Sequence, residues 1–529
     1  MNDSPATADA LGTPTASRPP TPRESSWAGF AAGALGLAVG SLVAAITDVI
    51  APFDAVGTAV INVAPGWLER WAIDTFGTAN KLVLRAGVLV VVLALAALIG
   101  RVMVRRRRVG LLGVVIVSTL GIVASVAGPD EGAGAAVPTV VGAVCAVLVM
   151  RVLLRPRHVE IPGRSRAPLG IDRRRAVVGT VGTFAGAFVA AMVGDGIRRS
   201  RVDDYRDTTA AALPPLDPST GDDRPIDVDA FAGAGVDPST PFITPIDDFY
   251  RIDTVLSFPR VEVASWRLTI DGLVDRPLAL SYDDLLAMPQ VERAITLCCV
   301  SNEIGGPLIG TAVWRGVMLR DLLDTAGING DATQVFSTSA DGWTCGFPVA
   351  AALDGRDALV ALGMNGAALP LEHGYPARLV VPGLYGYVSA TKWLERIELA
   401  TWDREGFWIP RGWAREAPVK TQSRIGHPRN GERIDGGAQR IAGVAWAQGR
   451  GIERVEIRVD EGPWIEATLA DDVSDDTWRQ WTLDWTPMPG RHSISVRATD
   501  KSGDTQVEQR TPVAPDGATG HHTITVDVG

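Results

Sequence analysis

Five long apolar stretches dominate the first 200 residues of the chain. They lie near residues 27–51, 82–104, 109–128, 135–154 and 176–194. Each is about 20 residues long, the length with which an α-helix crosses a hydrocarbon core of roughly 30 Å. One such run also suits a buried helix of a globular domain, but five runs separated by short polar loops are typical of a membrane domain. We therefore expect a bundle of five transmembrane helices over residues 27–195.

Arginine residues set the expected orientation of this bundle. The loops at 101–108 and 151–175 are rich in arginine, whereas the segments 52–81 and 129–134 are not. Basic loops stay in the cytoplasm, so five crossings place everything beyond residue 195 outside the cell membrane. Arg85, near the outer end of the second stretch, is expected to reach the interface with its long side chain.

The last basic loop carries a second signal. Residues 172–178 read Asp-Arg-Arg-Arg-Ala-Val-Val and precede a mild Gly/Ala-rich span. This run resembles a twin-arginine export signal, although it lacks the usual Phe-Leu pair. The alternative is that these are ordinary arginines of a cytoplasmic loop.

Two polar segments flank the membrane region. Residues 1–26 are rich in Pro, Ser and Thr, and residues 196–240 are rich in Asp, Pro, Thr and Ala. Such compositions bury little apolar surface. We expect a disordered tail at 1–26 and an extended linker at 196–240.

The remainder of the chain reads as two domains. From 241 to about 410, strand-like alternation (266–270) is mixed with helical signals, such as Ser281 before a helix and a helix that ends at Gly327. This mixture predicts an α+β domain. From 411 to 529 the pattern is all-β, as in a β-sandwich. Its predicted strands are 441–446, 455–459, 478–483 and 494–498.

Composition narrows the function classes. The formal net charge of −10 argues against nucleic acid as a partner. Four cysteines, at positions 145, 298, 299 and 345, do not suggest a disulfide framework. Cys145 lies in an apolar run, and we expect it and Cys345 to be buried thiols.

The adjacent cysteines Cys298 and Cys299 are the candidate chemical group. They end a strand-like run and are followed by the polar residues Ser301, Asn302 and Glu303. A thiolate is a soft metal ligand. Because no second Cys-x-x-Cys or His-x-x-His accompanies the pair, the ligand count excludes a zinc finger or an iron–sulfur cluster. A single cysteine suits a metal that an organic cofactor already chelates.

A longer pattern carries a family resemblance. Residues 369–383 read Leu-Pro-Leu-Glu-His-Gly-Tyr-Pro-Ala-Arg-Leu-Val-Val-Pro-Gly, followed by Tyr-Gly-Tyr at 385–387 and Lys-Trp-Leu at 392–394. Together with the cysteine segment and Trp-Arg-Gly-Val at 314–317, this resembles the sulfite oxidase family of molybdopterin enzymes over roughly residues 240–529. In that family one cysteine binds molybdenum and has an asparagine three residues later. Cys299 and Asn302 fit this spacing, so Cys299 is the expected metal ligand.

The resemblance also implies a cofactor site and an immunoglobulin-like dimerisation domain. The alternative for residues 411–529 is a sandwich that packs only against its own catalytic domain. The pterin contacts that match the family are, in chain order, Asp247, Tyr250, Arg251, Thr338, His373, Arg378, Thr391 and Lys392.

The expected function is oxygen-atom transfer at a molybdenum–molybdopterin centre. Glu303 would repel sulfite, and the sequence does not place Arg315, Arg411 or Arg415, so reduction of sulfoxides such as methionine sulfoxide stays open. A cofactor-free scaffold is the other alternative. With no Cys-x-x-Cys-His motif and no histidine in the five stretches, we expect no haem. Electrons then pass to or from a separate protein or quinone.

Overall fold

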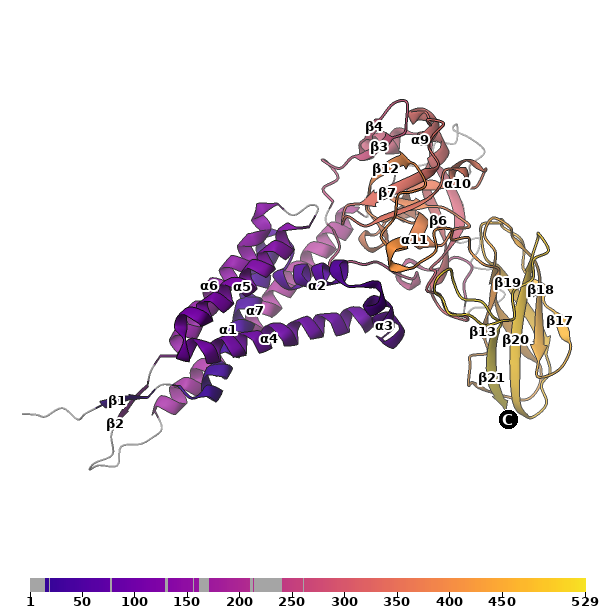
Figure 1. Ribbon diagram of the computed structural model, residues 1–529. Helices are drawn as coiled ribbons and strands as arrows, with labels where there is room; N and C mark the ends of the chain where they lie inside the picture. Colours follow the sequence, from indigo (N-terminus) through magenta and orange to yellow (C-terminus); the bar gives the residue numbers. More distant parts are fainter. Residues whose placement is uncertain are drawn as a thin grey trace, which may run out of the picture. The chain divides into compact units, whose positions relative to one another are not determined.

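The chain forms two compact units, residues 1–203 and 204–529, in the computed structural model (Figure 1). The structure describes residues 15–18, 20–76, 79–128, 132–155, 157–160, 171–209, 213, 240–259 and 261–529. Most of the predicted tail and most of the predicted linker lie outside these residues. The last helix of the first unit continues into the range expected for the linker, since α7 spans Ile171–Thr209.

The first unit is helical. Its helices are α1 (Pro22–Thr47), α2 (Pro52–Val63), α3 (Gly66–Phe76), α4 (Asn80–Arg105), α5 (Arg107–Val126), α6 (Ala136–Leu153) and α7; a 3-10 turn covers Ala133–Ala135, and β1 (Thr15–Arg18) pairs with β2 (Arg157–Glu160). Within the described residues, 5 helices are long and apolar enough to cross a membrane. They coincide with the five predicted stretches. The short helices α2 and α3 were not predicted, because the segment 52–81 carries no run of spanning length.

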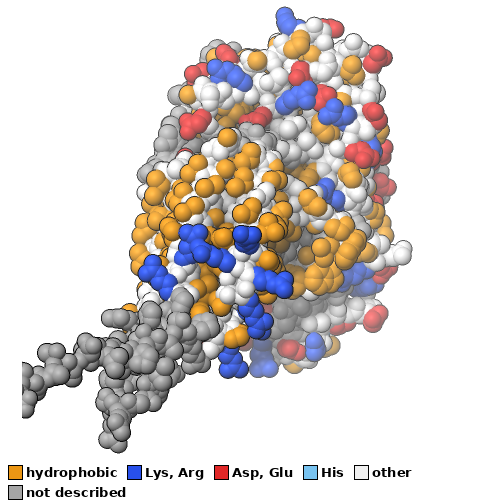
Figure 2. All heavy atoms as spheres, turned by 60° about the vertical axis from the view of Figure 1, so that its left-hand side comes forward, with side chains coloured by type: hydrophobic (Ala, Val, Ile, Leu, Met, Phe, Trp, Pro, Cys, Tyr) orange, Lys and Arg blue, Asp and Glu red, His pale blue; other side chains and the backbone are white. Residues whose placement is uncertain are grey.

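The outward faces of these helices are apolar. Val90, Leu120 and Phe188 keep 66%, 65% and 66% of their surface exposed. Figure 2 shows hydrophobic side chains covering the helical surface, with Lys and Arg side chains gathered near one end of it. The exposed arginines 105–108, between α4 and α5, belong to one of the loops predicted to be cytoplasmic. Such apolar faces suit a lipid solvent far better than water.

Small residues let the helix backbones come close. A Cβ atom added at Gly36 of α1 would lie 2.7 Å from the carbonyl oxygen of Gly142 on α6 and 2.9 Å from the Cβ of Ala146. Lipid-embedded helices gain no hydrophobic driving force from packing and depend on such close van der Waals contact. Gly36 therefore fixes the approach of α1 to α6.

A buried carboxylate joins α2 to two of the long helices. Asp54 is 3% exposed and pairs with Arg85 of α4 at 3.1 Å and with Arg198 of α7 at 3.2 Å. A buried charge is stable only when it is paired and hydrogen-bonded. The sequence predicted only that Arg85 would reach the interface; its ion-pair partner lies on a helix that the sequence reading missed.

Residues 241–410 contain two five-stranded sheets. One has the order β10-β9-β6-β5, with β11 paired to β9; the other has the order β4-β3-β12-β7-β8. The strands are β3 (Leu268–Gly272), β4 (Leu278–Leu280), β5 (Val291–Cys298), β6 (Ile309–Met318), β7 (Gln334–Ser339), β8 (Thr344–Pro348), β9 (Leu359–Met364), β10 (Ala367–Ala368), β11 (Arg378–Val380) and β12 (Leu394–Ala400). Side chains of both sheets and of the helix after β6 share one hydrophobic core.

Short helices connect these strands. They are α8 (Tyr282–Ala287), α9 (Leu319–Ala326), α10 (Ala350–Leu353), α11 (Gly386–Ser389) and the 3-10 turns η4 (Ile246–Asp248), η5 (Leu371–His373) and η6 (Ile409–Arg411). Ser281 caps α8 as predicted, with its hydroxyl accepting the N–H of Asp284 at 3.1 Å. Gly327 ends α9 at a φ of 71°, which confirms the predicted stop. Strands and helices thus alternate through residues 241–410.

Two further sheets make up the C-terminal region. Their orders are β13-β15-β19-β18 and β14-β21-β20-β16-β17. The strands are β13 (Gln422–His427), β14 (Arg433–Ile434), β15 (Gln439–Trp446), β16 (Ile452–Val459), β17 (Trp464–Glu466), β18 (Thr468–Leu469), β19 (Arg479–Trp485), β20 (Gly490–Asp500) and β21 (His522–Val528). All four predicted strands are present. A core that includes Trp481, Ile457 and Ile494 packs side chains of both sheets together.

The close approach of α1 and α6 yields a test. We expect Gly36→Leu to destabilise the helical unit by roughly 1–3 kcal/mol, the usual cost of overpacking a tight contact. Gly87→Leu is the matched control, because a Cβ at Gly87 meets nothing within 4 Å. Thermal unfolding of the full chain in detergent measures both; equal melting temperatures for the two variants would contradict the packing role.

Candidate active site

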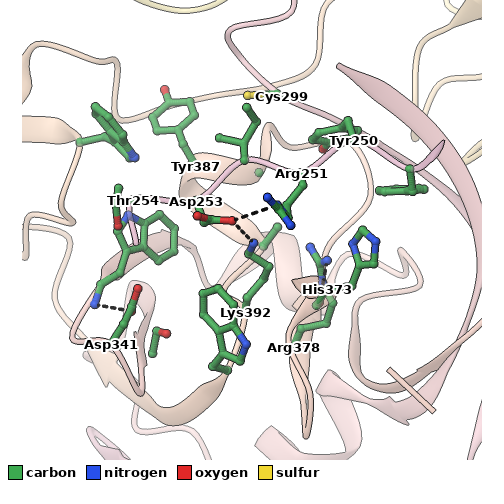
Figure 3. Close-up of a pocket in the computed structure, with 18 residues that line it drawn as sticks. Tyr250, Arg251, Asp253, Thr254, Cys299, Asp341, His373, Arg378, Tyr387 and Lys392 are labelled. Carbon is green, nitrogen blue, oxygen red and sulfur yellow. Dashed lines mark hydrogen bonds and ion pairs between the residues drawn. The ribbon is translucent and has the colours of Figure 1, made fainter. Parts of the chain in front are cut away.

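A cavity in the second unit contains the predicted metal ligand. About 770 Å³ of space, part of it open solvent, lies between the residues that line it. Figure 3 shows Cys299 near Tyr250 and Tyr387, and His373, Arg378 and Lys392 on another part of the wall. Segments far apart in the sequence therefore meet at one site.

Cys299 follows β5 directly and is held in a closed turn. Its N–H donates to the carbonyl of Leu308, and its carbonyl accepts the N–H of Asn302, both at 3.0 Å. The side-chain oxygen of Asn302 accepts the N–H of Leu308 at 2.8 Å. The Cys-x-x-Asn spacing therefore corresponds to a turn that begins at Cys299 and is stabilised by hydrogen bonds of Asn302.

The two adjacent thiols have different environments. Cys299 lines the cavity, whereas Cys298 is 2% exposed and packs in a hydrophobic cluster. Burial raises the pKa of both thiols. This difference supports Cys299 over Cys298 as the metal ligand, the choice that the asparagine spacing favoured.

Arg378 supplies a buried positive charge. It is 5% exposed, donates to the carbonyl of His373 at 3.1 Å and lies over the Trp314 ring at 4.8 Å. Burial lowers its pKa to about 10, so it stays protonated at neutral pH. Among the described residues, no carboxylate forms an ion pair with Arg378. A buried guanidinium without a carboxylate partner is suited to a bound anion such as phosphate.

His373 is a neutral member of the same wall. Its Nε2 lies 3.3 Å from the carbonyl oxygen of Ile246, and its ring packs edge-on against Phe249. Burial, followed by the charges of Arg378 and Lys392, lowers its pKa to about 3. At neutral pH it therefore acts as a hydrogen-bonding group without charge.

A glycine brings these groups together. Gly374 has a φ of 113°, and a Cβ there would lie 3.0 Å from Lys392 Cα and 3.1 Å from Arg378 Cβ. Only glycine adopts this backbone without strain and leaves this space. The His-Gly-Tyr-Pro-x-Arg spacing is thus explained by the packing of Arg378 against the Lys392 segment.

Lys392 forms an ion pair inside the cavity. Its ammonium donates to Asp253 at 3.0 Å and to the carbonyl of Glu372 at 3.2 Å. Arg251 lies 3.9 Å from the same Asp253 carboxylate. Sequence reasoning did not find Asp253, because an isolated aspartate in a loop carries no spacing signal.

The cavity lining includes six of the predicted site residues: Cys299, Tyr250, Arg251, His373, Arg378 and Lys392. The other three lie elsewhere. Asp247 is exposed in η4, Thr338 is half-buried in β7, and the Thr391 side chain is fully buried, with its hydroxyl 2.7 Å from Ser337 Oγ. Their predicted contacts with a cofactor would have to use the edge of the cavity or backbone groups.

The remaining wall is largely aromatic. Tyr387, Trp343 and Trp408 line the cavity with Tyr250. The three arginines considered as substrate-binding groups do not line it: Arg315 donates to Gln290, Arg411 to the carbonyl of Phe407, and Arg415 to Glu405. Glu303 is exposed and also lies outside the lining.

Family models match both parts of this unit. The oxidoreductase molybdopterin-binding domain matches residues 255–408, and the molybdenum-cofactor oxidoreductase dimerisation domain matches residues 414–513. Chicken sulfite oxidase is 31% identical over 323 residues, which cover 51% of this chain and 70% of that protein. The chain belongs to the sulfite oxidase family. It therefore contains the molybdopterin-binding domain of these oxidoreductases and the domain that follows it.

Three further proteins match different shares of the chain. Human mitochondrial sulfite oxidase is 29% identical over 322 residues, and the chain spans 58% of its length. An uncharacterized oxidoreductase of Bacillus subtilis is 36% identical over 152 residues, 29% of this chain and 74% of that protein. The crystal structure of the sulfane dehydrogenase SoxCD from Paracoccus pantotrophus matches 59% of this chain and 93% of that chain, with a TM-score of 0.48 and 24% identity.

The neutral state of His373 predicts a dependence of stability on pH. An unfolded histidine binds a proton near pH 6.5, while the folded His373 does so only near pH 3. Stability is therefore fully present above pH 6.5 and falls as the pH drops toward 3. At pH 5 the loss for cofactor-free protein reaches about 2 kcal/mol.

The variant His373→Gln tests this dependence. Glutamine keeps a hydrogen-bonding side chain but cannot take up a proton in this range, so the fall in melting temperature between pH 7 and pH 5 should become smaller. Thermal unfolding of the full chain at both pH values measures it. Parallel curves for the two proteins would show that His373 does not contribute.

Proposed function

We propose that this chain is a membrane-anchored molybdopterin oxidoreductase that transfers an oxygen atom to or from a small sulfur or nitrogen oxo-compound. The observation that carries the proposal is the meeting of the Cys299 thiol and the buried Arg378 guanidinium in one cavity. A scaffold has no physical need for the guanidinium there, because a buried charge is costly without a partner or ligand.

The residues present fit the expected cofactor. A soft thiolate at Cys299 suits molybdenum. Arg378, Lys392 and Arg251 would hold the phosphate and the polar edge of the pterin, with His373 as a neutral hydrogen-bonding partner. When bound, the molybdenum cofactor supplies two-electron oxygen-atom transfer.

The side chains of this chain bind and orient the reactants. Cys299 must lose its thiol proton before it can act as a ligand, since burial holds its pKa above the ordinary value. Tyr250 and Tyr387 keep their protons, because burial raises the pKa of both phenols. The hydroxyl of Tyr387 donates to the carbonyl of Ala414 at 2.5 Å, which fixes its ring in the wall. These aromatic rings limit water around the metal position.

The cavity chemistry favours a neutral substrate as a second candidate. Arg251 and Arg378 are the arginines of the lining within the described part of the chain, and both belong to the proposed pterin site. An oxyanion such as sulfite would therefore lose its hydration without a dedicated cation. The sulfoxide group of a compound such as methionine sulfoxide carries no net charge. Its methyl or alkyl group suits an aromatic wall.

The helical unit supports a membrane anchor. Its apolar helices and the arginine-rich loops favour a catalytic domain outside the cytoplasm under the positive-inside rule. The sequence at 172–178 would then serve as a twin-arginine signal for export of a folded, cofactor-loaded domain. Electrons would pass to or from a separate carrier protein or a membrane quinone.

The C-terminal sandwich is proposed to be immunoglobulin-like and to support a homodimer. The name of the matching family model and the two-sheet arrangement both favour this role. Association through such a domain is typical of symmetric oligomers. Size-exclusion chromatography with light scattering on the detergent-solubilised chain distinguishes a dimer from a monomer.

Replacement of each adjacent cysteine tests the metal site. Cys299→Ser should lower both the molybdenum content and kcat at least about 100-fold, because a hydroxyl is a poor ligand for a soft site. Cys298→Ser is the matched control, since it changes a neighbouring buried thiol outside the cavity, and it should retain the metal. Metal analysis measures the molybdenum content of both variants, each made in cells with an active cofactor pathway, and steady-state rates give kcat. Equal molybdenum in the two variants would contradict the assignment of Cys299 as ligand, and no molybdenum in the unaltered protein would favour the scaffold alternative.

A substrate comparison tests the second candidate. With an artificial electron carrier, kcat/KM for methionine sulfoxide reduction should exceed that for sulfite oxidation by about tenfold or more, since a desolvated anion without a partner costs over 1.4 kcal/mol. Steady-state rates on the purified full chain provide the ratio. Faster turnover of sulfite would instead support the sulfite-oxidising reaction.

A further inference from the structure

The strand that presents Cys299 lies at the edge of its sheet. In the order β10-β9-β6-β5, strand β5 has β6 on one side only. An edge strand leaves every second N–H and C=O without a sheet partner. The position of Cys299 therefore depends on what covers the other side of β5.

Residues of the C-terminal domain cover this edge at one position, three residues before Cys299. The N–H of Thr296 donates to the carbonyl of Asp476 at 2.9 Å. Its carbonyl accepts the side-chain N–H of Gln448 at 3.1 Å, and its hydroxyl accepts the backbone N–H of Trp478 at 2.7 Å. The N–H, the carbonyl and the hydroxyl of Thr296, which is 1% exposed, are thus engaged by that domain, and the hydroxyl also contacts that of Thr311 in β6.

The turn after Cys299 is held by the same domain. Arg424 of β13 donates to the carbonyl of Gly306 at 2.9 Å. The ring of His522 in β21 packs on Gly305, where an added Cβ would lie 2.3 Å from it. The Nδ1 of His522 accepts the N–H of Ile425 at 3.0 Å, which fixes the ring.

We propose that the C-terminal domain positions Cys299, through Thr296 before it and through the Gly305–Gly306 turn after it. Thr296 and Arg424 are positioning residues in this assignment; neither lines the cavity. The inference rests on the proposed function, in that Cys299 is the residue whose placement matters. It adds a second role to a domain whose family name refers only to dimerisation.

The substitution Thr296→Val tests the contact before Cys299. Valine keeps the shape of threonine but leaves the buried N–H of Trp478 without its acceptor, and it also removes the hydroxyl contact with Thr311 of β6. In cofactor-free full chain, we expect Cys299 to react about tenfold faster with iodoacetamide, because a buried unpaired N–H shifts local opening by about that factor. Peptide fragmentation in mass spectrometry separates Cys299 from Cys298. Thr296→Ser, which keeps the hydroxyl, should restore the slow rate.

The matched control is Thr499→Val. Thr499 is 4% exposed, and its hydroxyl lies 3.0 Å from that of Thr505, away from β5. The Thr499→Val variant loses a buried hydroxyl contact within the C-terminal domain. It should leave the reactivity of Cys299 unchanged. Equal rates for the Thr296→Val and Thr499→Val variants would overturn the proposal.

The loaded protein gives a second readout. The electron paramagnetic resonance spectrum of partly reduced protein should shift its g-values in Thr296→Val and not in Thr499→Val, because it reports the geometry of the cysteine sulfur at the metal. If Thr296→Val does not fold, Arg424→Met tests the contact after Cys299, because it removes the hydrogen bond to Gly306. This variant should also raise the alkylation rate of Cys299. An unchanged rate in Arg424→Met would overturn the proposal. Absence of turnover would contradict the proposed function alone, since alkylation is measured without cofactor.

Discussion

The candidate site depends on one buried positive charge, the guanidinium of Arg378. Its protein partners are backbone carbonyls and the face of Trp314, which stabilise a cation less than a carboxylate does. A buried charge held this way costs free energy in the empty protein. Under the proposed function, an anionic cofactor bound at Arg378 would offset that cost. The neutral state of His373 beside it follows first from burial and then from the charges of Arg378 and Lys392, which together lower its pKa.

Glycine makes this arrangement geometrically accessible. At Gly374 the chain adopts a positive φ and passes within contact of both Arg378 and Lys392. Asp253 balances the Lys392 charge and also lies 3.9 Å from Arg251, whereas no carboxylate among the described residues forms an ion pair with Arg378. This division of charges sets both the place and the sign of the group that the cavity accepts.

Local patterns in the sequence were sufficient for much of the fold. The five long apolar helices, the stop of α9 at Gly327 and the four C-terminal strands each follow from a run of neighbouring residues. The Cys-x-x-Asn turn was also readable, because the asparagine and the cysteine lie in one turn. Asp253, Tyr387 and Trp343 could not be assigned to the cavity, since segments distant in sequence bring them there. Helices α2 and α3 were missed because they are too short to give a membrane signal.

The edge position of β5 explains why two domains of this family adjoin. An edge strand makes Cys299 accessible to a cofactor from one side, but it also exposes unpaired backbone groups that favour slippage or aggregation. Only residues 409–413 separate the two family matches, and the second domain supplies the missing partners at Thr296 and at Gly306. A catalytic strand placed at an edge therefore needs a neighbour, and a domain that covers this edge is part of the metal site's support whatever other surface it uses for association.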